Sequence, residues 1–134
     1  MLIPSSWLTS TIRQSYLTDE ELVLCFTIDS GEFAWRNIIK KVQLNKKSLT
    51  KLQKDLLLGG FFCILDTDSD LFTEQFLGKR FKIKVDRYVD NKVIRNIIIE
   101  YDIADKPAEH DVTRDKEDDY FFKKTTGRDL PIND

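Results

Sequence analysis

Residues 81–103, FKIKVDRYVDNKVIRNIIIEYDI, contain two stretches of strand-like sequence on either side of a turn. In the first stretch, Phe81, Ile83 and Val85 fall on one side of an extended chain, and the lysines between them fall on the other. The DNK segment favours a turn, and the second stretch is rich in isoleucine. The sequence therefore predicts a β-hairpin with one dry face for a core and one wet face that carries cations.

Three more strands and a helix are predicted upstream of this hairpin. Gly31 suits the positive φ of a tight turn, and Ser48 is a candidate N-cap before leucines at helical spacing. Gly59 and Gly60 end that helical pattern. The expected elements are strands at 11–17, 21–28 and 33–44, a helix that follows Ser48, and strands at 81–89 and 93–103.

The segment between the helix and the hairpin is less regular. Residues 61–65, FFCIL, fit either a short buried strand or an apolar loop. Residues 66–78 predict a short helix that ends at Gly78, with Leu71, Phe72 and Phe76 pointing inward.

The order strand, strand, strand, helix, strand, strand is that of the oligonucleotide/oligosaccharide-binding (OB) fold, a Greek-key barrel of five strands. We therefore expect a mainly β protein, an OB-like five-stranded Greek-key barrel with a helix between the third and fourth strands. Such a barrel binds its ligand across the second and third strands and the loops around them.

The length of 134 residues fits one globular domain, which we place at residues 1–104. From residue 105 onward the chain is polar and charged, with nine acidic against six basic residues, and we expect a mobile acidic tail at 105–134. The formal net charge of −2 argues against a generally basic nucleic-acid binder. A case for nucleic acid must therefore rest on how the charges are distributed.

Basic residues gather in two blocks. Residues 36–54 contain seven basic residues and no acidic one, and residues 79–95 contain seven basic and two acidic residues. A single lysine run is ordinarily solvated surface, but two runs that share a face would form a binding surface.

No group of residues typical of a catalytic, cofactor or metal site is visible in the sequence. Cys25 and Cys63 lie in apolar stretches, where we expect reduced core thiols, and the single histidine, His110, lies in the polar tail. Residues 66–71 begin like a calcium loop, but Leu71 stands where that loop needs glycine. We expect no enzyme, no cofactor and no metal site.

No apolar stretch is long enough to span a membrane, and the first ten residues lack the features of a signal peptide. We expect a cytosolic protein of a bacterial host cell, without a membrane partner.

The run from NKKSLTKLQKDLLLGG through FLGKRFKIKVDRYVDNKVIRNIIIEYD, followed by an acidic tail, resembles the small single-stranded-DNA-binding proteins of bacteriophages and mobile elements. The resemblance covers roughly residues 12–103. It implies single-stranded DNA as the ligand, in replication or recombination. Tails in such families often end in an acidic stretch with a terminal aromatic, whereas here EDDYFF lies inside the tail and the chain closes with LPIND.

Single-strand binders combine a cationic groove with aromatic platforms on which bases stack. Trp35 is the first candidate platform, although FAW in a strand would also allow it to join Phe33 in the core. Tyr88 shares a face with Lys82 and Lys84 by parity. The predicted nucleic-acid-binding residues are Trp35, Arg36, Lys40, Lys41, Lys79, Arg80, Lys82, Lys84, Arg87, Tyr88, Lys92 and Arg95.

The alternative is a protein-interaction module or inhibitor that binds a host or recombination enzyme, and that could imitate DNA. Lysines on the concave face would favour DNA, whereas carboxylates there would favour mimicry. Tyr120, Phe121 and Phe122 are the predicted partner-docking residues, for replication or recombination proteins.

A homo-oligomer is also expected to be feasible, because the last strand is apolar enough to pair with a copy of itself. The choice between DNA and RNA stays open.

Overall fold

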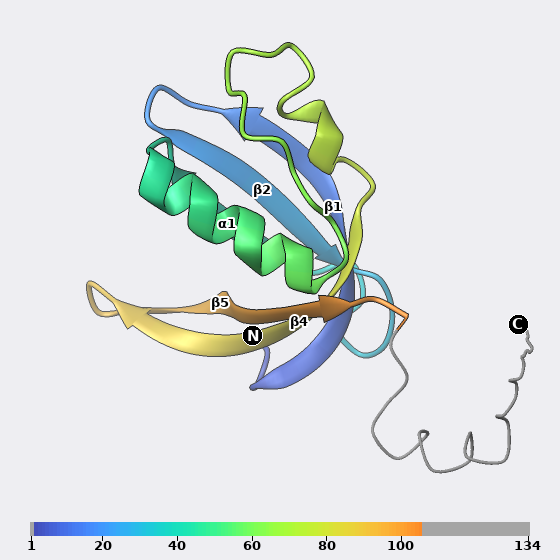
Figure 1. The fold of residues 1–134 in the computed structure, drawn as a ribbon. Helices are drawn as coiled ribbons and strands as arrows, with labels where there is room; N and C mark the ends of the chain where they lie inside the picture. The colour runs from blue at the N-terminus through green and yellow to red at the C-terminus, as the bar shows by residue number, and fades with distance from the viewer. Residues whose placement is uncertain (1, 106–134) are drawn as a thin grey trace, which may run out of the picture. The chain divides into compact units, whose positions relative to one another are not determined.

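The structure is a computed structural model and describes residues 2–105. Five antiparallel strands form one strongly curved sheet, and a single α-helix packs against it (Figure 1). The elements are β1 (Ser6–Leu17), β2 (Glu21–Ile28), β3 (Asn37–Gln43), α1 (Lys46–Leu58), the 3₁₀ turn η1 (Glu74–Phe76), β4 (Arg80–Asp90) and β5 (Val93–Ile103). The mainly β class and the strand-helix order are therefore confirmed.

The strands lie in the order β3-β2-β1-β4-β5. The first three form a meander, and the long connection through α1 brings β4 back beside β1. This spatial order is that of a Greek key. It places the two predicted hairpins, β2–β3 and β4–β5, at opposite edges of the sheet.

The sheet is open, so a closed barrel is not confirmed. β3 and β5 are its two edge strands, and no ladder of hydrogen bonds joins them. Helix α1 contacts both edge strands and buries Leu49, Leu52 and Leu56. Because the helix supplies apolar cover where the two edges approach, the core is closed without pairing them.

The core lies between the inner face of the sheet and α1. Phe81, from β4, packs against Phe26 and Tyr101, with ring centroids 6.1 and 6.3 Å apart. Gly59, at the end of α1, is in contact with this cluster, since a Cβ there would overlap the ring of Phe81. The helix end is therefore set by close approach to an aromatic core.

Several local expectations need correction. The third strand begins at Asn37 rather than at residue 33, because residues 32–35 form turns. Asn45 caps α1 in place of Ser48, whose backbone N–H donates to the Asn45 side chain at 2.8 Å. Residues 61–65 form no strand, and the predicted helix at 66–78 is reduced to η1.

The prediction that Leu71, Phe72 and Phe76 all point inward is partly wrong as well. Phe72 and Phe76 are buried, but Leu71 is 65% exposed.

Cys25 and Cys63 are both buried free thiols, as expected. No helix among residues 2–105 has the length and apolar character to cross a membrane. The predicted tail, with His110 and Tyr120, lies outside the described residues, as do Phe121 and Phe122.

Candidate nucleic-acid interface

The outer face of β2 and β3 is the surface on which the sequence predicts binding. Pairing of Cys25 with Ile39 and of Thr27 with Asn37 puts these side chains on the face opposite to the core residue Phe26. The Thr27 hydroxyl donates to the Asn37 side-chain oxygen at 2.7 Å. Along β2 this face carries the small side chains of Val23, Cys25 and Thr27, which are all buried, while Ile39 of β3 is 46% exposed.

Trp35 stands at one end of this face in an unusual conformation. Its N–H donates to the carbonyl of Ile28 at 2.8 Å, while the N–H of Ile28 donates to the carbonyl of Arg36 at 2.9 Å. This pattern is that of a G1-type β-bulge, whose first position normally holds glycine because φ is positive there. Trp35 occupies that position with a φ of 70° and is 73% exposed. This exposure excludes the alternative in which Trp35 joins Phe33 in the core.

Arg13 lies over the indole of Trp35. A register shift in β1 between Ile12 and Gln14 leaves Arg13 outside the regular pairing, and its guanidinium carbon is 5.9 Å from the centre of the Trp35 ring. Sequence reasoning missed Arg13, since it lies in an ordinary strand pattern and a bulge leaves no clear signal there. The two side chains border a hollow of about 270 Å³, which is lined by Arg13, Gln14, Cys25, Thr27, Trp35 and Asn37.

The hollow contains no reactive nucleophile. Burial raises the pKa of the Cys25 thiol, and a hydrogen bond with Thr27 opposes the shift only in part. A buried thiol with a raised pKa stays protonated at neutral pH. Cys25 therefore forms part of the floor of the hollow.

A second concavity follows the open seam between β3 and β5. It measures about 420 Å³ and shares Asn37 with the Trp35 hollow, so the two adjoin. Its cations are Arg36, Lys41 and Arg95, and no carboxylate lines it. The lining residues of this seam groove are Leu2, Arg36, Asn37, Ile38, Ile39, Lys41, Ile94, Arg95 and Asn96.

Other predicted cations lie elsewhere. Lys40 points to the inner side of the sheet, opposite Leu24, and lines a cavity of about 180 Å³ between β3 and α1. Burial lowers the pKa of Lys40, although the carboxylate of Asp55 partly offsets this effect. The alternation of the strand places Lys41, the neighbour of Lys40, on the outer face, although Lys41 also borders this cavity.

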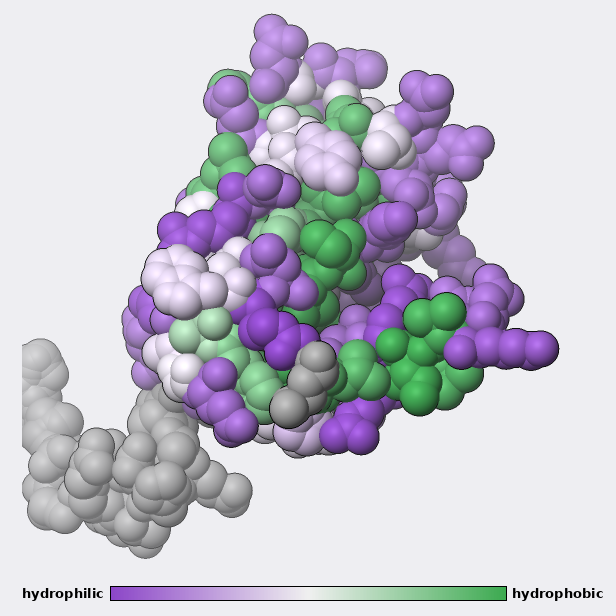
Figure 2. Space-filling model, turned by 180° about the vertical axis from the view of Figure 1, so that it is seen from behind, coloured by the Kyte–Doolittle hydropathy of each residue, from purple (hydrophilic) through white to green (hydrophobic). Residues whose placement is uncertain are grey.

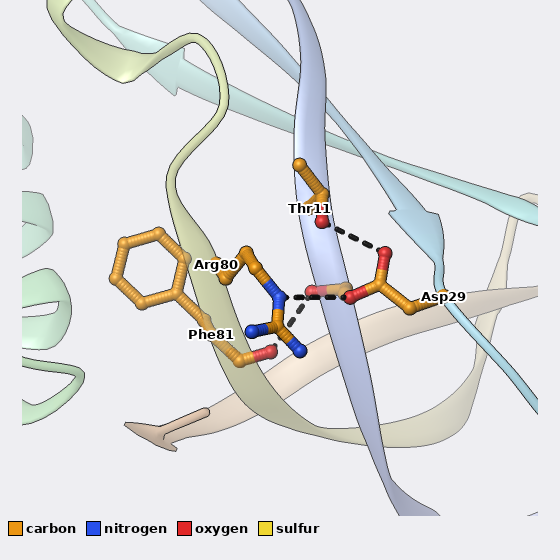
Figure 3. Close-up of polar contacts among 5 residues, drawn as sticks. Thr11, Asp29, Arg80 and Phe81 are labelled. Atoms are coloured by element: carbon orange, nitrogen blue, oxygen red, sulfur yellow. Dashed lines mark hydrogen bonds and ion pairs between the residues drawn. The ribbon is translucent and has the colours of Figure 1, made fainter. Parts of the chain in front are cut away.

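Arg80 is held by an acid far away in sequence. Its Nε is 3.4 Å from Asp29 Oδ2, while Asp29 Oδ1 accepts a hydrogen bond of 2.7 Å from the Thr11 hydroxyl (Figure 3). Nearby, Ser10 donates to the carbonyl of Phe81 at 3.2 Å. Arg80 thus pairs with Asp29 at the junction of β1, β2 and β4, while half of its side chain is exposed.

The remaining predicted residues follow β4 and the hairpin. Lys82 and Lys84 lie on the outer face, and Lys84 Nζ is 3.7 Å from Glu100. Lys79 Nζ lies 5.0 Å from the centre of the Phe61 ring. Tyr88 is half exposed, and Arg87, Lys92 and Arg95 surround the hairpin end. Of the predicted set, the structure therefore brings Trp35, Arg36, Lys41 and Arg95 together at the adjoining hollow and seam groove.

Searches with protein-family models and among curated proteins gave no match for this chain. No group of three or more His, Cys, Asp or Glu side chains in the described part of the chain is placed to hold a metal ion.

Proposed function

We propose that this chain binds single-stranded DNA across the outer face of β2 and β3, with Trp35 as a stacking platform. The observation that carries the proposal is the conformation of Trp35. A non-glycine residue held at positive φ costs about 1–3 kcal/mol, and such residues cluster at functional sites. Here the residue is also the most exposed tryptophan, so its indole contributes little to the core.

The proposed architecture is an OB-like barrel that is open at the β3–β5 seam. Strand order, the helix between β3 and β4, and the Greek-key return of β4 all support this assignment. OB-like barrels bind ligands on the face of the second and third strands, flanked by the first and last hairpin loops. The Trp35 hollow and the seam groove lie on and beside that face.

The chemistry of the two concavities fits a single strand. Bases stack on aromatic rings whatever their sequence, and each stacked base contributes about 1–3 kcal/mol. Phosphates follow at every nucleotide, and Arg36, Lys41 and Arg95 supply cations in the adjoining groove. Arg13 adds a guanidinium plane beside the indole, which favours both stacking and phosphate contact.

The outer face of β4 adds two lysines beyond this groove, each opposite a carboxylate of β5, Asp102 or Glu100. Lys82 and Lys84 point outward there. We infer that they bind phosphates of the same strand, in the setting of bacteriophage or mobile-element replication or recombination. Docking of a replication or recombination protein through Tyr120, Phe121 and Phe122 remains a proposal for the tail.

The deciding experiment is a titration of a labelled oligo-dT by fluorescence anisotropy at about 50 mM and about 200 mM salt. Trp35→Ala is expected to weaken binding by about 1–3 kcal/mol and to remove most of the tryptophan quenching. Phe62→Ala is the matched control, since Phe62 is a 58% exposed aromatic in the loop after α1. Equal affinities of Trp35→Ala and wild type would reject the platform.

The same titration with oligo-rU and with duplex DNA identifies the nucleic acid. The proposal requires that duplex bind more weakly than oligo-dT, because paired bases do not expose their faces for stacking. A wild-type protein that binds no oligonucleotide at the lower salt would overturn the function and leave the protein-interaction alternative.

A further inference from the structure

The end of the β4–β5 hairpin projects from the body of the protein. All residues from 87 to 95 are exposed, and the two strands are joined by Asn91 and Lys92, whose φ values of 49° and 67° are those of a primed turn. We call residues 87–95 the hairpin arm. Figure 2 shows an apolar cluster on it, bordered by hydrophilic side chains. Val89, Val93 and Ile94 are between 52% and 63% exposed.

A two-stranded arm with exposed valines and isoleucine is an interaction surface. Isolated two-stranded hairpins are marginally stable in water, and contiguous exposed apolar side chains commonly mark binding sites. Arg87, Lys92 and Arg95 give the arm three cations against the one carboxylate of Asp90. Its partner is therefore expected to combine apolar side chains with negative charge.

The loop between α1 and β4 has those two properties. Phe62, Ile64 and Leu71 are 58%, 59% and 65% exposed, and Asp66, Asp68 and Asp70 lie between them in sequence. We call residues 62–72 the acidic loop. No lysine or arginine lies within it.

The acidic loop contains a hollow of about 290 Å³ lined by Ile64, Asp66, Ser69, Leu71, Phe72 and Gln75. The Gln75 side chain fixes its shape, because it accepts from the N–H of Ile64 at 2.7 Å and donates to the carbonyl of Ile64 at 2.8 Å. A cavity of about 150 Å³ is large enough to hold benzene, so this hollow can take an aliphatic side chain.

The arm and the loop cannot meet within one molecule. The hairpin arm ends on one side of the sheet, whereas the acidic loop lies beyond the far end of β1 and β2 (Figure 1). Contact between them requires two copies of the chain.

We propose that the hairpin arm of one molecule docks into the acidic loop of a second copy, in a head-to-tail contact. Val89 and Ile94, which pair across the hairpin and so share a face, enter the hollow, and the arm cations face Asp66, Asp68 and Asp70. Arm-to-arm and loop-to-loop contacts are disfavoured, because each brings like charges together. A docked pair keeps one unused arm, on one molecule, and one unused loop, on the other, so the contact repeats along a chain or closes into a ring.

Sedimentation velocity across the micromolar range tests the contact. Wild type is expected to associate with rising concentration. An arm variant, Val89→Lys with Ile94→Lys, and a loop variant, Ile64→Lys with Leu71→Lys, are each expected to raise the dissociation constant about tenfold or more. All four positions are exposed, and circular dichroism checks that the fold is kept. Leu58→Lys, at a 63% exposed position on α1, is the matched control and leaves association unchanged.

Mixing the two variants gives the sharper result. The arm variant keeps an intact loop and the loop variant keeps an intact arm, so the mixture forms a one-to-one dimer and nothing larger. A mixture that stays monomeric overturns the proposal, as does a wild type that sediments as a monomer throughout. Loss of association in Leu58→Lys also overturns it, because the contact would then lie on α1.

Discussion

The two halves of β4 belong to one continuous strand but have different environments. Phe81, Ile83 and Val85 are completely buried, whereas every residue from Arg87 to the end of the strand is exposed. The difference follows the neighbouring strand. β1 pairs with β4 only as far as Val85, opposite Ser6, so the second half has β5 as its single partner. Alternation shows which residues share a face, and the length of the neighbouring strand decides whether that face is core.

The largest effect is expected from matched truncations in the two halves. Phe81→Ala removes a buried ring and should lower the free energy of unfolding by about 3–5 kcal/mol. Val89→Ala, at a 63% exposed position, should change it by less than about 0.5 kcal/mol. Urea denaturation followed by circular dichroism measures both. A similar decrease in both variants would mean that the arm is part of the cooperative core.

A second prediction tests how closely the end of α1 packs against the buried half of β4. Gly59 has a φ of −90°, so alanine fits its backbone conformation, but the new Cβ would overlap the Phe81 ring. Gly59→Ala should therefore destabilise the protein by about 1–3 kcal/mol, as overpacking does. Gly31→Ala is a useful contrast, because a Cβ there meets nothing within 4 Å and the cost comes from a φ of 87°. If overlap is the cause, Gly59→Ala should lower the free energy of unfolding less in a Phe81→Leu background than in wild type, because leucine leaves more room for the new Cβ.

Much of this fold could be predicted from sequence, since β2 and β5 have the bounds that their patterns predict and Gly59 ends the helix as expected. The closed barrel that we expected is not confirmed, because the sequence does not show whether α1 or a ladder covers the edges of β3 and β5. The site was harder. Parity placed Trp35 beside Phe33, but both lie in turns, where the two-residue period does not apply.

The cations also show how far a local sequence pattern can predict the candidate site. Local charge density predicted Arg36, Lys41 and Arg95, which lie at the seam groove, together with Lys40, which faces α1. The ion pair of Arg80 with Asp29 joins residues 51 positions apart and has no local signal. Arg13 depends on a bulge in β1.

The third prediction separates stability from binding at Trp35. Trp35→Gly places glycine at positive φ, where it is the preferred residue, and should stabilise the fold by about 1 kcal/mol. The same variant should bind oligo-dT more weakly by about 1–3 kcal/mol if the indole is a platform. Thermal denaturation and anisotropy on one preparation measure both changes. A destabilised Trp35→Gly protein would show that the indole supports the fold through its contact with Arg13.

The fourth prediction concerns the two partly exposed lysines on the well-packed half of β4. Lys82→Glu with Lys84→Glu should keep the fold at a modest cost in stability, because the ion pair of Lys84 with Glu100 is worth about 0–1 kcal/mol and the new glutamates face Asp102 and Glu100 on β5. Oligo-dT binding should weaken, and the log–log salt dependence should become shallower by about 0.7 for each phosphate that the variant no longer neutralises. An unchanged salt slope would remove this face from the binding surface.

The smallest effect is expected in the arm, where Arg95 lies 3.3 Å from Asp90 and both side chains are about half exposed. Asp90→Asn should change the free energy of unfolding by less than about 1 kcal/mol, because water already screens this pair. It also removes the negative charge nearest to Arg95, which lines the seam groove, so oligo-dT affinity should rise modestly at low salt. The increase should shrink as salt shortens the Debye length from about 30 Å at 0.01 M to about 8 Å at 0.15 M. Asp19→Asn is the matched control, since it makes the same change in net charge at the exposed β1–β2 turn. If the affinity rises equally in both variants, overall charge rather than the groove attracts the strand.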